Sequence, residues 1–280
     1  MEPLASRHCR LGHHVTATPD DSWNAGDRYE RFMGRWSRPM AQAFVRWTGV
    51  PPGRHWLDVG TGTGALASAI LEIAEPSAVI GCDPSGPFVD SARASVRDPR
   101  ATFVVAGVGS LPRREAGYDA VVSGLALNFF PDASSAVREQ VEVASHGGLI
   151  GAFVWDYTQG MEFLRYFWDA AASIDADASR LDEGRRFPIC DGESLAAVFQ
   201  AGGVARVRVT ALSVVTRFAS FDDYWLPFLG GTGPAPSFVS GLTESQVAAL
   251  QRELASRLPT GPDGAIALKA KAWAVLGYRE

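Results

Sequence analysis

The chain of 280 residues has few cysteines, no excess of basic residues and no long apolar run. Its three cysteines, Cys9, Cys82 and Cys190, are odd in number and far apart, which excludes a disulfide framework and a four-thiolate zinc site. Acidic residues outnumber basic ones by 31 to 26, so no basic field is available for a nucleic-acid backbone. Because apolar runs stay shorter than a signal peptide or a membrane span requires, we expect a reducing, cytoplasmic setting without a membrane.

The residues that are present favour a large folded domain, since 46% are apolar and 10% are aromatic. Residues 1–27 mix Pro, His, Thr, Asp and Gly without a period, which predicts a flexible N-terminal arm. The His and Cys residues of this arm match no structural zinc spacing, so we expect no metal. Residues 28–50 carry apolar side chains at steps of three and four, which predicts a helical cap.

Strand-like and helix-like segments alternate along the rest of the chain. The predicted strands cover residues 55–60, 77–83, 101–106, 118–123, 149–155, 205–215 and 265–276, and the predicted helices cover residues 65–74, 87–96, 133–144, 163–174, 193–201 and 243–258. The first five strands interleave with helices, which indicates an α/β fold with a parallel sheet covered on both faces. Residues 156–190 and 222–260 are expected to form substrate lid or insertion segments. Their aromatic groups at 163–168 and 224–228 are suited to the walls of an apolar pocket, although aromatics at helical spacing more often pack in a core.

A run rich in glycine follows the first predicted strand, in the order Asp58-Val59-Gly60-Thr61-Gly62-Thr63-Gly64. Glycines at such a turn let the backbone bend sharply and let a ligand press against it. Asp83 ends the second predicted strand, where a carboxylate accepts hydrogen bonds from both hydroxyls of a ribose. The pattern predicts a nucleoside site. A nicotinamide dinucleotide is an alternative because the same glycines satisfy its spacing, although Asp58 beside the turn disfavours a pyrophosphate.

These motifs resemble those of class I S-adenosylmethionine-dependent methyltransferases, in particular the small-molecule branch of types 11 and 25. The resemblance rests on residues 57–64 with Asp83 and on residues 29–37, 103–106, 118–123, 154–157 and 224–228, and it covers residues 28–280. It implies a Rossmann-like seven-stranded sheet, mostly parallel, with the last strand antiparallel and a lid insertion between the last strands. It also implies S-adenosylmethionine as cofactor and a small organic acceptor that is methylated on O, N or C, with secondary metabolism as the expected setting.

The resemblance assigns cofactor contacts to individual residues of this chain. Gly60, Gly62 and Gly64 would line the methionine moiety, Asp83 would bind the ribose, and Asp58 would orient the turn. Pro84 and Ser85 would flank the adenine, together with Gly107 and Val108. Tyr29, Arg35 and Ser37 would close over the amino-acid end of the cofactor from the helical cap.

Two segments depart from the pattern of these methyltransferases. Relatives carry an acidic residue after the third strand, in a string such as Ala-Asp-Ala, where this chain has Ala106-Gly107-Val108. The loss of this acceptor for the adenine amino group predicts weakened cofactor binding, by roughly ten- to a hundredfold. The usual Arg-Pro-Gly-Gly before the fifth strand is replaced by Ser145-His146-Gly147-Gly148.

Methyl transfer from a sulfonium requires alignment and exclusion of water more than side-chain chemistry. The candidates for a base at the expected carboxyl end of the sheet are His146, Asp156 and Tyr157, with Asn128 as a positioning group. Because two motifs are altered, an alternative is an enzyme of the same fold that carries out a displacement without methylation, such as an intramolecular ring closure. A noncatalytic subunit that supports a partner is a third hypothesis, and a homodimer or a partner subunit is compatible with the apolar last strand.

Overall fold

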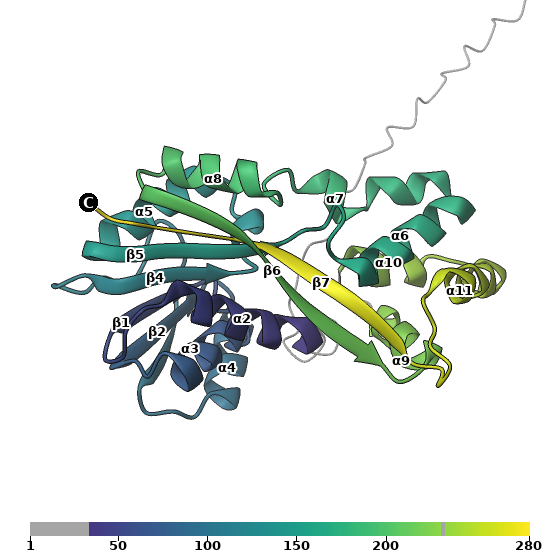
Figure 1. Cartoon of the computed structure of the whole chain (residues 1–280), viewed down its shortest axis with the longest axis horizontal. Coiled ribbons are helices and arrows are strands. Elements are labelled where there is room, and N and C mark those ends of the chain that lie inside the picture. Colours follow the sequence, from purple (N-terminus) through teal and green to yellow (C-terminus); the bar gives the residue numbers. More distant parts are fainter. Residues whose placement is uncertain (1–33, 231–232) are drawn as a thin grey trace, which may run out of the picture.

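The alternation of strands and helices folds into a seven-stranded sheet in the computed structural model, which describes residues 34–230 and 233–280 (Figure 1). The strand order is β3-β2-β1-β4-β5-β7-β6, and β7 runs antiparallel to both of its neighbours while β1 to β5 are parallel. The predicted mostly parallel sheet with an antiparallel last strand is therefore confirmed. The predicted arm at residues 1–27 and the predicted cofactor contact of Tyr29 lie outside the described residues.

The elements follow the predicted order, with several short helices added. The strands are β1 His55–Val59, β2 Ala78–Asp83, β3 Ala101–Val105, β4 Tyr118–Gly124, β5 Ala144–Trp155, β6 Ala205–Phe218 and β7 Ile266–Tyr278. The α-helices are α2 Arg35–Thr48, α3 Ala65–Ile73, α4 Gly86–Ser95, α5 Ala133–Val143, α6 Glu162–Ile174, α7 Glu183–Arg186, α8 Gly192–Ala201, α9 Phe221–Trp225, α10 Pro234–Ser240 and α11 Glu244–Arg257. The 3-10 helices are η2 Leu127–Phe129, η3 Ala176–Arg180 and η4 Leu226–Gly230. Within residues 34–230 and 233–280, no helix combines the length and apolarity needed to cross a bilayer.

Helices cover both faces of the sheet, as Figure 1 shows. On one side α2 packs along α3, and Phe44 of α2 places its ring 4.8 Å from the ring of Phe153 in β5. On the other side α5 packs against α8, which in turn contacts β6 and β7. The central strands β1, β2 and β4 and most of β5 are almost fully buried, as expected for a parallel sheet, whereas the edge strands β3 and β6 are partly exposed. This rigid sandwich fixes the carboxyl ends of β1, β2, β4 and β5 relative to one another.

The last two strands extend beyond the rest of the sheet as a two-stranded ribbon (Figure 1). The pairing of β5 with β7 stops at Trp155 and Ala272, whereas β6 stays paired with β7 as far as Ile266. The short helices α9 and α10 pack with α6 near the ribbon's end, where Phe228 stacks on Phe163 at 4.5 Å and on Phe167 at 4.4 Å. Of the two interpretations of these aromatic groups, pocket wall or core, the structure supports the core.

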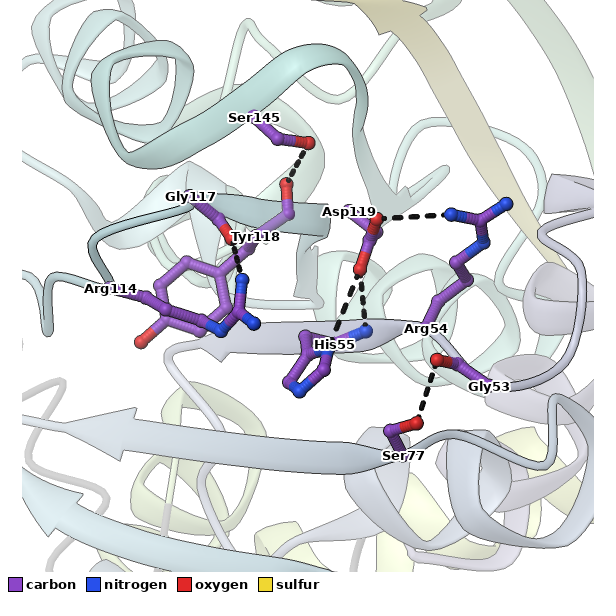
Figure 2. Close-up of polar contacts among 9 residues, drawn as sticks. All are labelled: Gly53, Arg54, His55, Ser77, Arg114, Gly117, Tyr118, Asp119 and Ser145. Carbon is purple, nitrogen blue, oxygen red and sulfur yellow. Dashed lines mark hydrogen bonds and ion pairs between the residues drawn. The ribbon is translucent and has the colours of Figure 1, made fainter.

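The amino ends of the parallel strands are closed by polar contacts that hold loops together. Figure 2 shows Asp119 at the start of β4, which accepts a hydrogen bond from the backbone N–H of His55 at 2.8 Å and contacts the Arg54 guanidinium. Nearby, the Ser145 hydroxyl donates to the backbone carbonyl of Tyr118. His146 follows at this edge and is exposed, because it is the third residue of β5 and so lies at the amino end of that strand. The expectation that His146 lies at the carboxyl end of the sheet is therefore wrong.

Asp156 fastens the end of β5 to the ribbon. Its carboxylate contacts the Lys271 ammonium at 2.9 Å and accepts hydrogen bonds from the Thr158 hydroxyl at 2.7 Å and the Gln159 amide at 3.1 Å. Burial alone would raise the pKa of Asp156, but these partners together lower it below the ordinary value. The carboxylate is committed to the turn after β5 and to β7, so the assignment of Asp156 as a base is corrected to a structural ion pair.

The variant Asp156→Asn should lose about 1–3 kcal/mol of the free energy of unfolding near pH 7, because Lys271 would keep no charged partner. Since the folded-state pKa of Asp156 lies below its ordinary 3.8, this contribution is present above about pH 4 and is lost as the pH falls through the folded-state value. Urea unfolding of both proteins at pH 7 and at pH 3 measures the difference. Equal stability at pH 7 would contradict the structural assignment.

Candidate functional site

The glycine-rich turn leaves β1 in a conformation that only glycine adopts readily. Gly60, Gly62 and Gly64 have φ angles of +75°, +54° and +89°. A Cβ on Gly60 would lie 2.6 Å from the Cβ of Ala126, whereas a Cβ on Gly62 would meet no atom within 4 Å. The turn therefore packs tightly against the loop after β4 at Gly60 and exposes bare backbone at Gly62.

Asp58 lies beneath this turn and is fully buried. The Thr61 hydroxyl donates a hydrogen bond to Asp58 Oδ2 at 2.7 Å, which ties the first residues of the turn to β1. Burial raises the pKa of Asp58 to about 7, against the hydrogen bond from Thr61, and the neighbouring Asp83 adds to the rise. Asp58 is thus a part of the support of the turn and does not line its open side.

Asp83 ends β2 and faces the glycine turn across the β1–β2 boundary. Its Oδ2 accepts a hydrogen bond from the Gly62 N–H at 3.0 Å, and its Oδ1 accepts one from the Ser85 N–H at 2.9 Å. Burial raises the pKa of Asp83, and these two backbone donors oppose that effect. Each carboxylate oxygen keeps acceptor capacity beyond its single backbone bond. The carboxylate is therefore held in a fixed orientation and can still accept hydrogen bonds from a ligand.

A cavity opens at the carboxyl ends of β1, β2, β4 and β5. Its lining residues are Ser37, Ala41, Gly60, Thr61, Gly62, Thr63, Ala65, Leu66, Asp83, Pro84, Phe88, Gly124, Leu125, Ala126, Phe129, Phe130, Phe153, Trp155, Tyr157, Leu164 and Glu183. The strand order reverses here, because β1 has β2 on one side and β4 on the other. Open α/β sheets bind their ligands at such a switch point. The cavity is thus where the fold itself predicts a ligand.

The lining is mostly apolar, with few polar side chains. Ser37 on α2 is buried, and its hydroxyl has no hydrogen-bond partner among the described residues. Buried hydroxyls are nearly always hydrogen-bonded in native proteins, so this one is available to a polar atom of a ligand in the cavity. The titratable side chains of the lining are Asp83, Tyr157 and Glu183, and the lining contains no Lys, Arg or His side chain. The site is therefore built for a largely apolar ligand with a few polar groups.

The structure brings only some of the predicted site residues into this cavity. Ser37, Gly60, Gly62, Asp83, Pro84 and Tyr157 line it, whereas Asp58 and Gly64 support the turn from behind. Gly107 lies beside Pro84 in the loop after β3, and neither Gly107 nor the exposed Val108 belongs to the lining. Asn128 belongs to η2 but does not reach the lining, and its side-chain Nδ2 is buried without a hydrogen-bond partner in the described part of the chain.

Arg35 does not face the cavity, contrary to the expectation that it closes over a cofactor. Its guanidinium forms two hydrogen bonds with the Asp223 carboxylate, at 2.7 and 3.0 Å, and lies over the ring of Phe218. These partners belong to α9 and to the end of β6. Arg35 therefore joins the helical cap to the ribbon. Its partner lies 188 residues away in the sequence, so the residues around Arg35 could not predict this contact.

Sequence reasoning missed the residues that line the rest of the cavity. Phe129 and Phe130 come from η2 and the residue after it, Trp155 closes β5, and Glu183 begins α7. Short helices of three or four residues leave no periodic signal, so their side chains could not be assigned to one face. The charged string around Glu183 resembles a solvated turn, and only tertiary packing buries it.

Comparison with known proteins finds similarity over part of this chain. Residues 57–152 match the family described as "Methyltransferase domain". An uncharacterized protein of Mycobacterium tuberculosis is 30% identical over 144 residues, which cover 50% of this chain and 51% of that protein. A demethylmenaquinone methyltransferase of Roseiflexus is 31% identical over 94 residues, which cover 34% of this chain and 40% of that enzyme. The chain thus spans about half the length of the mycobacterial relative.

Solved structures show the same fold at low sequence identity. The YcgJ protein of Bacillus subtilis superimposes with a TM-score of 0.56 at 17% identity, covering 86% of this chain and 98% of that one. The [4+2]-cyclase SpnF superimposes with a TM-score of 0.50 at 17% identity, covering 86% of this chain and 80% of that one. Residues 57–152 therefore resemble a methyltransferase domain, and the chain shares the overall fold of these solved structures.

Proposed function

We propose that this protein is an S-adenosylmethionine-dependent methyltransferase that acts on a small organic molecule. The single observation that carries the proposal is the carboxylate of Asp83, which the Gly62 N–H holds at 3.0 Å inside the cavity beside the bare glycine turn. The match of residues 57–152 to a methyltransferase domain supports it. We further propose that the protein works in the cytoplasm and that its reaction belongs to small-molecule biosynthesis.

The residues present fit an adenosyl sulfonium. The backbone at Gly62 lies open to the cavity, so a ligand can approach it where a side chain would intrude. Asp83 would accept hydrogen bonds from the ribose hydroxyls, and the apolar side chains of Pro84 and Phe88 would contact the adenine. The orphan hydroxyl of Ser37 would bind the amino-acid end. When bound there, S-adenosylmethionine supplies an electrophilic methyl group on a positively charged sulfur.

The protein's own contribution to such a reaction is orientation and exclusion of water. Aromatic side chains at Phe129, Phe130 and Trp155 line the cavity beside the glycine turn, and Phe130 would lie 3.7 Å from a Cβ on Gly60. An acceptor held against these rings would have a fixed orientation toward the reacting centre, and the rings would exclude water from it. Alignment of this kind supplies most of the rate enhancement that an already activated donor needs.

A displacement without methylation is a second candidate function. Two observations favour it: Gly107 stands where the related enzymes carry an acidic residue, and a [4+2]-cyclase shares this fold. Incubation with methyl-labelled S-adenosylmethionine and a panel of small acceptors separates the two functions. Transfer yields S-adenosylhomocysteine in equal amount to the methylated acceptor, whereas a cyclising enzyme would leave the bound cofactor unchanged.

Titration calorimetry with S-adenosylhomocysteine tests the site directly. We expect micromolar binding to the unmodified protein and about ten- to a hundredfold weaker binding to Asp83→Ala, because the ribose hydroxyls would lose a charged acceptor. Asp90→Ala is the matched control, since Asp90 is an exposed carboxylate on the adjacent helix α4. An Asp83→Ala protein that binds as tightly as the control would refute the proposed site.

The variant Gly107→Asp tests the missing adenine acceptor. The φ angle of Gly107 is not in the left-handed region, and a Cβ there would make an ordinary contact of 3.4 Å with Pro84. An aspartate is therefore tolerated, and we expect it to tighten S-adenosylhomocysteine binding by about tenfold. Gly107→Asn controls for side-chain size without the charge. If Gly107→Asp weakens binding or leaves it unchanged, the adenine does not lie beside this residue.

A further inference from the structure

One buried carboxyl group of the cavity has no part in the cofactor contacts proposed above. Glu183 is only 5% exposed, begins α7 and lines the cavity together with Tyr157 and Leu164. The neighbouring Gly184 packs directly on the backbone of Tyr157, where a Cβ would lie 2.9 Å from the Tyr157 carbonyl oxygen. Glu183 thus stands in the wall that continues from the end of β5.

Among residues 34–230 and 233–280, no cation forms an ion pair with Glu183. The Trp168 indole N–H donates a hydrogen bond to Glu183 Oε2 at 2.6 Å. The neighbouring cation, Arg165 on α6, is instead committed to Asp182, to which it donates from Nη1 at 2.9 Å and from Nη2. A buried carboxylate without a cation is costly, and such groups persist mainly where a ligand or a reaction uses them.

The electrostatic surroundings fit a group that changes its protonation near neutral pH. Burial raises the pKa of Glu183 to about 7, against its own backbone amide and the Trp168 N–H, while Asp182 raises it further and Arg165 lowers it. Tyr157 lines the same cavity, and Arg186 follows three residues after Glu183 at the end of α7. A base is most effective when its pKa lies close to the working pH.

We propose that Glu183 binds and orients the acceptor through its reacting hydroxyl group and takes the proton of that hydroxyl, so that the acceptor is a largely apolar molecule with one O–H donor. The apolar character of the acceptor follows from the lining of the cavity. There the carboxyl group of Glu183 lies among the apolar side chains of Phe129, Phe130, Trp155 and Leu164. The inference rests on the proposed function. It goes beyond that function by naming the class of acceptor and the residue that recognises it.

The proton and the electron pairs balance in this assignment. The acceptor oxygen forms its new bond to the methyl carbon with its own electron pair, and its proton moves to a carboxylate oxygen of Glu183. The electrons of the broken carbon–sulfur bond stay on sulfur, which loses its positive charge. Glu183 then returns the proton to solvent. The Trp168 N–H keeps the carboxylate oriented throughout, which makes Trp168 a positioning residue.

A matched pair of probes tests this recognition without turnover. 2-Naphthol carries one hydroxyl, and 2-methoxynaphthalene has nearly the same shape without the donor. Both are titrated by fluorescence into protein saturated with S-adenosylhomocysteine at about pH 8, where a phenol that titrates near pH ~10 is neutral and Glu183 is mostly ionised. We expect 2-naphthol to bind about tenfold more tightly than its methyl ether.

Variants at Glu183 and Trp168 separate recognition from packing. Glu183→Gln should lose most of the preference for 2-naphthol, and the preference of the unmodified protein should fall as the pH drops from about 8 to about 5.5 because Glu183 becomes protonated. Trp168→Phe removes the hydrogen bond that orients the Glu183 carboxylate but keeps the carboxylate itself, so it should reduce the preference less than Glu183→Gln does. Equal binding of the two probes, or no binding of either, would overturn the proposal, as would a preference that survives in Glu183→Gln.

Thermal unfolding of the same variants excludes a purely structural role. The raised pKa of Glu183 means that stability falls as the pH rises from the ordinary value of 4.5 through about 7, so at pH 8 the ionised carboxylate carries its full cost to the folded state. Glu183→Gln should therefore melt at a higher temperature than the unmodified protein at pH 8, and a lower melting temperature there would contradict the proposal. Calorimetry with S-adenosylhomocysteine on each variant keeps the two proposals apart, because Glu183→Gln should bind it normally. If the unmodified protein fails to bind it, the proposed function fails first.

Discussion

The site depends on one hydrogen bond, from the backbone N–H of Gly62 to the Asp83 carboxylate. It joins the ends of β1 and β2, whose parallel pairing brings the turn and the carboxylate to the same edge of the sheet. The bond requires the left-handed backbone that glycine permits at this position. Because the strands beneath are buried on both faces, the turn cannot relax without disturbing the core. The protein thereby holds a polar anchor and an open backbone surface at the mouth of an otherwise apolar cavity.

The rest of the molecule divides between support and recognition. Arg35 joins the helical cap to α9, which follows β6, and Asp156 joins the end of β5 to β7. These contacts attach the lid lobe, which comprises α6, α7 and α9 to α11, to the sheet. The lobe's aromatic side chains form a core of their own, so α6 and α7 stand as a rigid wall beside the cavity. Glu183 lies on this wall, at the start of α7, and its buried carboxyl group destabilises the folded state when it is ionised. A residue that costs stability and faces a cavity is best explained by what it binds.

Much of the fold could be predicted from the sequence, because the signals are local. The glycine run after a short apolar strand, Asp83 at the next strand's end and the strand–helix alternation all reflect properties of contiguous residues. The start of β5 was missed, since its glycines at 147 and 148 resemble a turn, although β4 pairs with this segment from Ala144. The partners of Arg35 and Asp156 and the burial of Glu183 depend on contacts between distant segments, which no local pattern encodes.

The most direct measurement of the central claim is a crystal structure of this protein grown with saturating S-adenosylhomocysteine. The account predicts the ligand in the cavity beside Gly60 to Gly64, with both ribose hydroxyls within hydrogen-bond distance of the Asp83 carboxylate. The sulfur should face the part of the cavity that is lined by Trp155 and Glu183. Density for the ligand elsewhere, or an empty cavity at saturating ligand, would contradict it.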